Sequence, residues 1–96
     1  MTYPALTHLA QAYLHQDLWE DYGDPSDAVD DFLERSDYAG DLAEEVDRAL
    51  AEFPTEEETK RFVQDELDSM YLPDEDGMTY RDWLRSIAER ARSRMR

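Results

Sequence analysis

Apolar residues recur along most of the chain at intervals of three and four, the spacing that places side chains on one face of an α-helix. Runs that alternate with a period of two are missing, and the β-branched residues typical of strands are scarce. The pattern therefore predicts an all-α protein, with about five short helices in a compact single domain that spans residues 1–96.

Proline, glycine and helix-capping residues divide this pattern into segments. A first helix is expected to start near Pro4, which suits a first helical turn. A second follows Asp24, a predicted N-cap, and ends by Ser36. A third is predicted over residues 37–52, before Pro54, which cannot continue a helix.

The last two helices are each expected to begin at a threonine. Thr55 opens the sequence Thr-Glu-Glu-Glu, a capping box, and the helix after it is predicted to reach about residue 70. Residues 72–77 combine proline, acids and glycine and are predicted to form a loop. Thr79 then caps the last helix, with Asp82 three residues on.

The charge of the chain is strongly negative and unevenly spread. Residues 1–80 hold 4 basic and 23 acidic side chains, a net charge of −19. Residues 81–96 hold 6 arginines and 2 acids, a net charge of +4. The acidic body disfavours direct binding of nucleic acid or an anionic membrane and predicts a cationic protein partner. The arginines are expected to stabilise the end of the last helix and to pair with acids elsewhere on the fold.

Composition also restricts the chemistry and location of the protein. There is no cysteine, so disulfides and zinc–thiolate sites are excluded. No apolar run approaches the roughly 18 residues of a membrane span, and the start of the chain lacks the features of a signal peptide. These observations predict a cytoplasmic protein.

The stretch HQDLWEDYGDP at residues 15–25 is the first candidate for a metal or catalytic site. His15 and Asp17 could supply two ligands, but His8 lies two helical turns away, about 10.5 Å along a helix. That separation is too large for both histidines to hold one metal ion. EF-hand spacing, nucleophile motifs and phosphate-binding glycine loops are all absent. We therefore predict no catalytic residue, no metal and no cofactor, with His15 hydrogen-bonding at the helix end.

The same stretch is also the first candidate for a partner surface. Trp19 and Tyr22 lie among carboxylates, so they either anchor the segment in the core or form an exposed binding hot spot. If the segment binds a partner, the candidate residues are Trp19, Glu20, Asp21, Tyr22 and Asp24.

Several short blocks of sequence together resemble a known family. They are Tyr3-Pro4-Ala5-Leu6, Tyr13-Leu14-His15-Gln16-Asp17, Tyr22-Gly23-Asp24-Pro25, Phe53-Pro54 and Gly77-Met78-Thr79-Tyr80-Arg81-Asp82-Trp83-Leu84. Over roughly residues 3–90 the chain resembles the CdiI-type immunity proteins of bacterial contact-dependent growth inhibition systems. The resemblance assigns a structural role to His15, Gln16, Asp17, Tyr80 and Trp83.

The resemblance implies a cytoplasmic, non-enzymatic protein that binds and neutralises the toxic C-terminal domain of a cognate effector. Many such toxins are nucleases with cationic clefts, and the acidic charge of this chain suits that target. The oligomeric state is left open, with a monomer favoured. Charge alone equally supports an acidic helical adaptor, or a DNA mimic that regulates a nucleic-acid-binding protein. A third hypothesis, an enzyme, requires metal-dependent turnover that Asp17→Asn abolishes.

Overall fold

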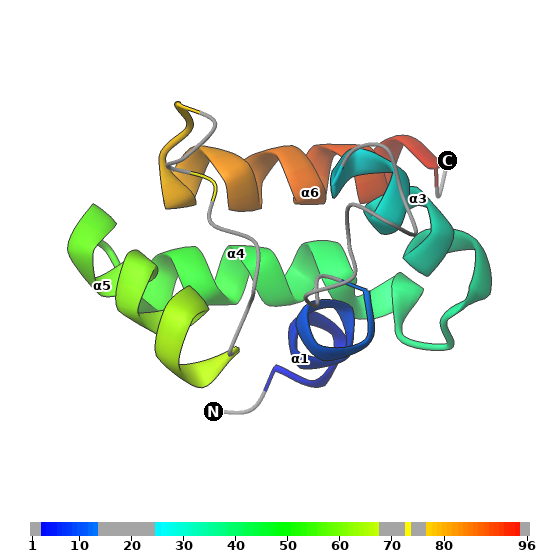
Figure 1. The fold of residues 1–96 in the computed structure, drawn as a ribbon, viewed down its shortest axis with the longest axis horizontal. Helices are drawn as coiled ribbons and strands as arrows, with labels where there is room; N and C mark the ends of the chain where they lie inside the picture. The colour runs from blue at the N-terminus through cyan, green and yellow to red at the C-terminus, as the bar shows by residue number, and fades with distance from the viewer. Residues whose placement is uncertain (1–2, 14–24, 68–72, 74–76, 95–96) are drawn as a thin grey trace.

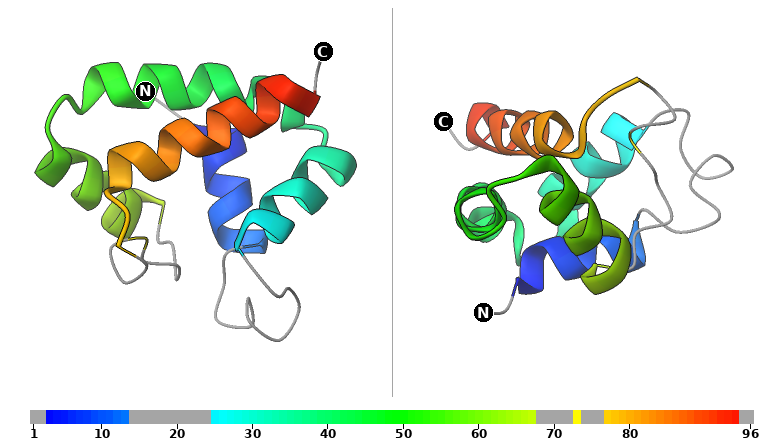
Figure 2. Two further views of the ribbon diagram at one scale, coloured as in Figure 1. Left: turned by 90° about the horizontal axis from the view of Figure 1, so that it is seen from above. Right: turned by 90° about the vertical axis from the view of Figure 1, so that its left-hand side faces the viewer.

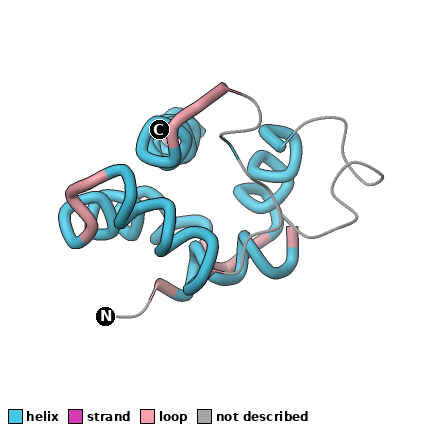
Figure 3. The backbone as a smooth tube through the Cα atoms, turned by 60° about the vertical axis from the view of Figure 1, so that its left-hand side comes forward, coloured by secondary structure: helices cyan, strands magenta, loops and turns pink. Residues whose placement is uncertain are grey.

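In the computed structural model of the chain, the residues that are described form five α-helices around one apolar core. The structure describes residues 3–13, 25–67, 73 and 77–94. Within these ranges it contains helices and connecting turns and no strand, as Figure 3 shows. The predicted all-α class is confirmed.

The helical elements follow the order that the sequence predicted. They are α1 (Pro4–Ala12), α3 (Pro25–Arg35), the 3₁₀ turn η1 (Ala39–Asp41), α4 (Leu42–Glu52), α5 (Glu56–Arg61), the π-helical turn η2 (Phe62–Glu66) and α6 (Tyr80–Arg94).

The helices α4 and α6 lie along each other and form the largest helix pair, and the others pack around them (Figures 1 and 2). α1 packs against α4, α5 against α6, and α3 against both η1 and α6. The Cα radius of gyration is 12.1 Å. A folded domain of this length is expected at about 12.5 Å, so the chain is packed as tightly as an ordinary globule.

The core consists of the apolar faces that periodicity predicted. Burying each large aliphatic or aromatic side chain contributes about 1.5–3 kcal/mol. The predicted face residues found buried are Leu6, Leu9, Ala10, Ala28, Val29, Phe32, Leu33, Leu42, Val46, Ala49, Phe62, Val63, Leu67, Tyr80, Trp83, Leu84, Ile87 and Ala91. Tyr13, Leu50 and Phe53 are partly buried against this core.

Both predicted threonine caps are present. Thr55 Oγ1 accepts a 3.1 Å hydrogen bond from the backbone N–H of Glu58, and Thr79 Oγ1 accepts one of 3.0 Å from Asp82. Gly77, in the predicted loop, has a φ of 78°, a left-handed conformation that glycine adopts without strain. The predicted cap Asp24 lies outside the described residues.

The third helix begins later than predicted. Tyr38 donates its backbone N–H to Ser36 Oγ at 3.1 Å, and Ala39 donates to the Ser36 carbonyl at 3.2 Å. These bonds form a turn, and η1 separates it from α4, which starts at Leu42. The prediction of a helix from residue 37 was wrong because the serine side chain competes for the backbone there.

The fourth helix is also interrupted where an unbroken helix was predicted. Leu67 donates its N–H to the Phe62 carbonyl at 3.0 Å, which closes the wide turn η2. A π turn takes in one more residue than an α turn, so Leu67 returns beneath Phe62 and both face the core. No proline or glycine in this stretch indicated the change.

Candidate functional site

Most residues that the sequence singled out lie in a part of the chain outside the described ranges. They are His15, Gln16, Asp17, Trp19, Glu20, Asp21, Tyr22 and Asp24. Their predicted roles stay predictions. The described residues on either side, Tyr13 and Pro25, belong to the ends of α1 and α3 that lie next to this segment in sequence.

Tyr80 and Trp83 are both in the core, with exposed fractions of 1 % and 5 %. The Tyr80 hydroxyl accepts a 2.8 Å hydrogen bond from Gln64 Nε2 in η2. The two aromatic side chains therefore hold the first turn of α6 against the rest of the fold and present no free surface to a partner.

Three arginines near the end of α6 are paired with acids of two other helices, as the sequence predicted. Arg90 Nε lies 3.3 Å from Asp30 Oδ1, and Arg94 lies 2.5 Å from Glu34. Arg92 pairs with an aspartate of α4, Asp47. Arg90 and Arg94 are four residues apart on α6, and their partners Asp30 and Glu34 are four residues apart on α3. The two helices therefore run in the same direction along this contact. These arginines hold α6 between α3 and α4 rather than forming a free basic patch.

Acids outnumber these pairs and leave a negative surface. Apart from Glu45, Glu52 and Glu56, which accept hydrogen bonds, eight acidic side chains in the described part of the chain form no ion pair there, and all eight are exposed. They are Asp27, Asp37, Asp41, Glu44, Glu58, Asp65, Glu66 and Glu89. The acidity inferred from composition is therefore displayed to solvent and is not consumed in internal pairs.

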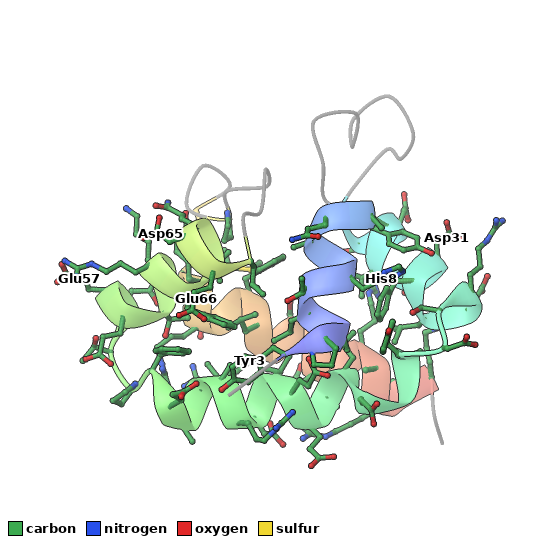
Figure 4. All side chains as sticks on the ribbon, turned by 90° about the horizontal axis from the view of Figure 1, so that it is seen from below. Tyr3, His8, Asp31, Glu57, Asp65 and Glu66 are labelled. Carbon is green, nitrogen blue, oxygen red and sulfur yellow. The ribbon has the colours of Figure 1, made fainter. Side chains whose placement is uncertain are left out.

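Four aromatic rings meet where α1, α3 and the turn after α3 come together. The ring of His8 lies 5.9 Å from Tyr13, 5.8 Å from Phe32 and 5.5 Å from Tyr38, centroid to centroid. Phe32 is fully buried, whereas Tyr38 is 43 % exposed. Figure 4 shows His8 between α1 and α3. The core thus continues into a partly open aromatic surface at this junction.

A second cluster surrounds Tyr3, at the start of α1. Its partly buried hydroxyl donates a 2.5 Å hydrogen bond to Glu52 Oε1, and the Arg48 guanidinium lies 5.4 Å from its ring centroid. Burial raises the pKa of Tyr3 to about 12, helped by the hydrogen bond to Glu52 and by the negative charges of Glu52 and Glu66, while Arg48 opposes the shift (Figure 4). A phenol with this pKa keeps its proton, so the contact joins α1 to α4 and is no acid–base site.

The Tyr3 contact predicts a loss of stability in alkali. The pKa of the folded state, about 12, exceeds the ordinary 10.0, so the folded protein holds this proton more tightly than the unfolded chain. The resulting stability is present below pH 10 and is lost as the pH rises through about 12. Tyr3→Phe should lower the free energy of unfolding by about 1–2 kcal/mol at neutral pH and lack this alkaline loss. Urea denaturation across that pH range measures both.

The matched control is Tyr38→Phe, which removes an exposed hydroxyl instead. It should keep the alkaline loss of the parent protein. The assignment to Tyr3 fails if both variants lose stability with pH in the same way as the parent.

A family model described as CdiI immunity protein matches residues 2–91 of the 96. The chain belongs to the CdiI immunity protein family. Searches of curated proteins and of solved structures found no match. The resemblance inferred from the sequence blocks is confirmed over nearly the whole chain.

Membership of the CdiI family assigns the chain a toxin-neutralising immunity role, with a cognate toxin protein as its partner. Proteins of this family are generally non-catalytic. In the ranges that the structure describes, no group of three or more His, Cys, Asp or Glu side chains is placed to hold a metal ion. Nor is any helix of those ranges long and apolar enough to cross a membrane.

One important residue of this CdiI protein was missed by the sequence analysis. Glu45, in the middle of α4, is 1 % exposed, and its two carboxylate oxygens accept 3.0 Å hydrogen bonds from the backbone N–H groups of Ala5 and Leu6. It therefore caps α1 from another helix. A signal was present: Glu45 lies three residues after Leu42 and four before Ala49, on the buried face of α4.

A second missed group joins α4, α5 and α6. Glu56 accepts hydrogen bonds from the backbone N–H groups of Tyr80 at 2.7 Å and Arg81 at 3.1 Å, which caps α6. The Arg81 guanidinium donates to the carbonyls of Leu50, at 3.3 Å, and Phe53, at the end of α4. Charged side chains that sequence reasoning assigns to solvent thus fix the relative placement of three helices.

Proposed function

We propose that this CdiI protein neutralises a cationic toxin domain, a nuclease, by covering its nucleic-acid-binding surface with an acidic surface of its own. The observation that carries the proposal is the set of eight acids without ion pairs in a protein of this family. Carboxylates can occupy the positions that phosphates take on such a toxin. We further propose that residues 1–96 act as a single, monomeric, cytoplasmic domain without catalysis.

Electrostatics would act mainly on the speed of this encounter. Opposite surface fields can raise association rates to about 10⁸–10⁹ M⁻¹s⁻¹ at low salt, and added salt screens them. Dissociation depends instead on a few desolvated anchor residues at the interface. The contribution of charge is therefore measured by the association rate and that of the anchor residues by the dissociation rate.

An immunity gene is expected to adjoin the gene of a large secreted effector, and the test is association kinetics with the C-terminal domain of that neighbouring effector. We expect a tight one-to-one complex that blocks the toxin's nuclease activity, with an on-rate about tenfold or more higher at low salt than at high salt. An on-rate that does not change with salt would contradict the electrostatic proposal while leaving the immunity role in place. Absence of binding at either salt concentration would contradict this pairing.

The same acids also favour the alternative of a DNA mimic that regulates a housekeeping nucleic-acid-binding protein. Capture of such a protein by the purified chain, with no binding to the neighbouring effector domain, would support the alternative. Binding to the effector domain alone would exclude it.

A further inference from the structure

The exposed part of the aromatic cluster lies on Tyr38, in the turn between α3 and η1. Of the large hydrophobic side chains that the structure describes, Tyr38 is the most exposed, at 43 %. Its inner side rests on the ring of His8, which in turn contacts Phe32. The ring is therefore supported from below by the core and open to solvent above.

The backbone around Tyr38 is fixed on both sides. Its N–H donates to Ser36 Oγ at 3.1 Å, and its carbonyl accepts a 3.0 Å hydrogen bond from the N–H of Asp41. A tyrosine that is already held in place loses little conformational entropy when a partner binds it. This is the property of a preformed anchor.

Two acidic residues close to Tyr38 in sequence form no ion pair in the part of the chain described. Asp37 precedes Tyr38 in the turn and Asp41 follows within one turn of chain, and both are exposed with no ion pair in the part of the chain described. By contrast Asp31, on the adjoining helix α3, is already paired with Arg35 at 2.6 Å. The negative charge beside Tyr38 is thus available to a partner.

The second exposed hydrophobic side chain offers a poorer site. Met78, at 38 % exposed, lines an open groove of about 630 Å³ between α3 and α6. The arginines of that groove, Arg90 and Arg94, are paired with Asp30 and Glu34. The groove carries both signs of charge and does not select a cationic partner.

We propose that Tyr38, with Asp37 and Asp41, receives a lysine or arginine side chain of the toxin's cationic surface. The cation would lie on the exposed tyrosine ring by a cation–π contact and bond to the flanking carboxylates. This inference rests on the proposed function and identifies the residues that carry tight binding. Aromatic side chains of this kind commonly dominate interface energies.

The decisive experiment uses the full chain and the C-terminal domain of the neighbouring effector as the probe. Tyr38→Ala should raise the dissociation constant about 30-fold or more, mainly through faster dissociation, because the aromatic ring that anchors the partner is removed. Tyr38→Phe keeps the ring and should stay within about threefold of the parent. The matched control Met78→Ala, at the other exposed hydrophobic, should change binding by less than about threefold.

A charge-matched pair of double variants separates local contact from net charge. The double variant Asp37→Asn with Asp41→Asn should associate more slowly and also dissociate faster, so that its affinity falls about tenfold. Glu58→Gln with Glu89→Gln removes the same charge elsewhere and should slow association only. Circular dichroism melts establish that each variant is folded, as expected for exposed positions.

The outcomes are distinguishable. If the parent binds and Tyr38→Ala binds equally well, or both double variants behave alike, the anchor is wrong and the immunity function stands. If the parent does not bind the effector domain at all, the proposed function fails for this partner and the anchor fails with it.

Discussion

Glu45→Ala is expected to lower the free energy of unfolding by about 3–4 kcal/mol, the largest effect of any single substitution considered. The change removes the acceptor of two buried backbone N–H groups, those of Ala5 and Leu6. Each buried donor left without an acceptor costs about 1–3 kcal/mol. For a domain of this size the melting temperature should fall by about 15–25 °C. Free energies of unfolding are typically about 5–15 kcal/mol in total, so this loss is a large fraction of the stability.

The effect is large because α1 has no cap of its own. Tyr3, at its N-cap position, makes no side-chain capping bond, and the first turn contains no acid. The carboxylate of Glu45 supplies both the hydrogen bonds and the negative charge that the positive end of a helix attracts. Glu45→Gln keeps the size and one acceptor oxygen, and it should cost about 1–2 kcal/mol.

The control for this prediction is the neighbouring Glu44→Ala on the exposed face of α4. It makes the same chemical change in the same helix and should alter the stability by no more than about 0.5 kcal/mol. Urea and thermal denaturation followed by circular dichroism compare the variants. Equal losses from the two substitutions would show that the buried cap has no special role.

Local pattern explains what the sequence predicted correctly. The apolar spacing of each helix and the caps at Thr55 and Thr79 depend only on residues within a few positions of one another. The pairing of the α6 arginines followed from a simpler rule, that a basic end on an acidic body finds opposite charges. These features needed no knowledge of how the helices pack.

Tertiary hydrogen bonds explain what was missed. Glu45, Glu56 and Arg81 look like solvated charges in the sequence, because their acceptors and donors lie 22 to 40 residues away. Only Glu45 carried a local signal, its place between Leu42 and Ala49 on the apolar face of α4. The π turn η2 is likewise a tertiary effect, because it places both Phe62 and Leu67 in the core.

The candidate surface shows both the strength and the bias of sequence reasoning. An aromatic residue beside acids was sought in residues 15–25, where such residues are densest. Asp37-Tyr38 meets the same rule, but so does Asp82-Trp83, whose ring is buried, so the rule alone does not single out the exposed tyrosine. What exposes Tyr38 is the turn before α4, in a stretch that was predicted to be helical.

Arg81→Ala should lower the free energy of unfolding by about 3 kcal/mol, the second largest effect. The guanidinium donates to two carbonyls at the end of α4, those of Leu50 and Phe53, and to Thr59 Oγ1 at 3.2 Å. Thr59 is itself buried. Hydrogen bonds from a charged group contribute about 1.5–3 kcal/mol. Without Arg81 the Phe53 carbonyl still accepts a 3.0 Å hydrogen bond from Thr59 Oγ1, so the loss falls mainly on the Leu50 carbonyl and on Thr59. In hydrogen exchange, the backbone amides at the end of α4 and in the adjoining parts of α5 and α6 should lose protection.

Arg81→Lys separates geometry from charge in this contact. A lysine ammonium is a single point charge and cannot span both carbonyls and the threonine as the planar guanidinium does. We expect it to recover less than half of the stability lost in Arg81→Ala. The control Arg85→Ala removes an exposed arginine one turn on, which pairs with Asp82 of the same helix, and should cost no more than about 1 kcal/mol. Full recovery by lysine would mean that charge alone holds the three helices together, and the proposed fork of hydrogen bonds would be wrong.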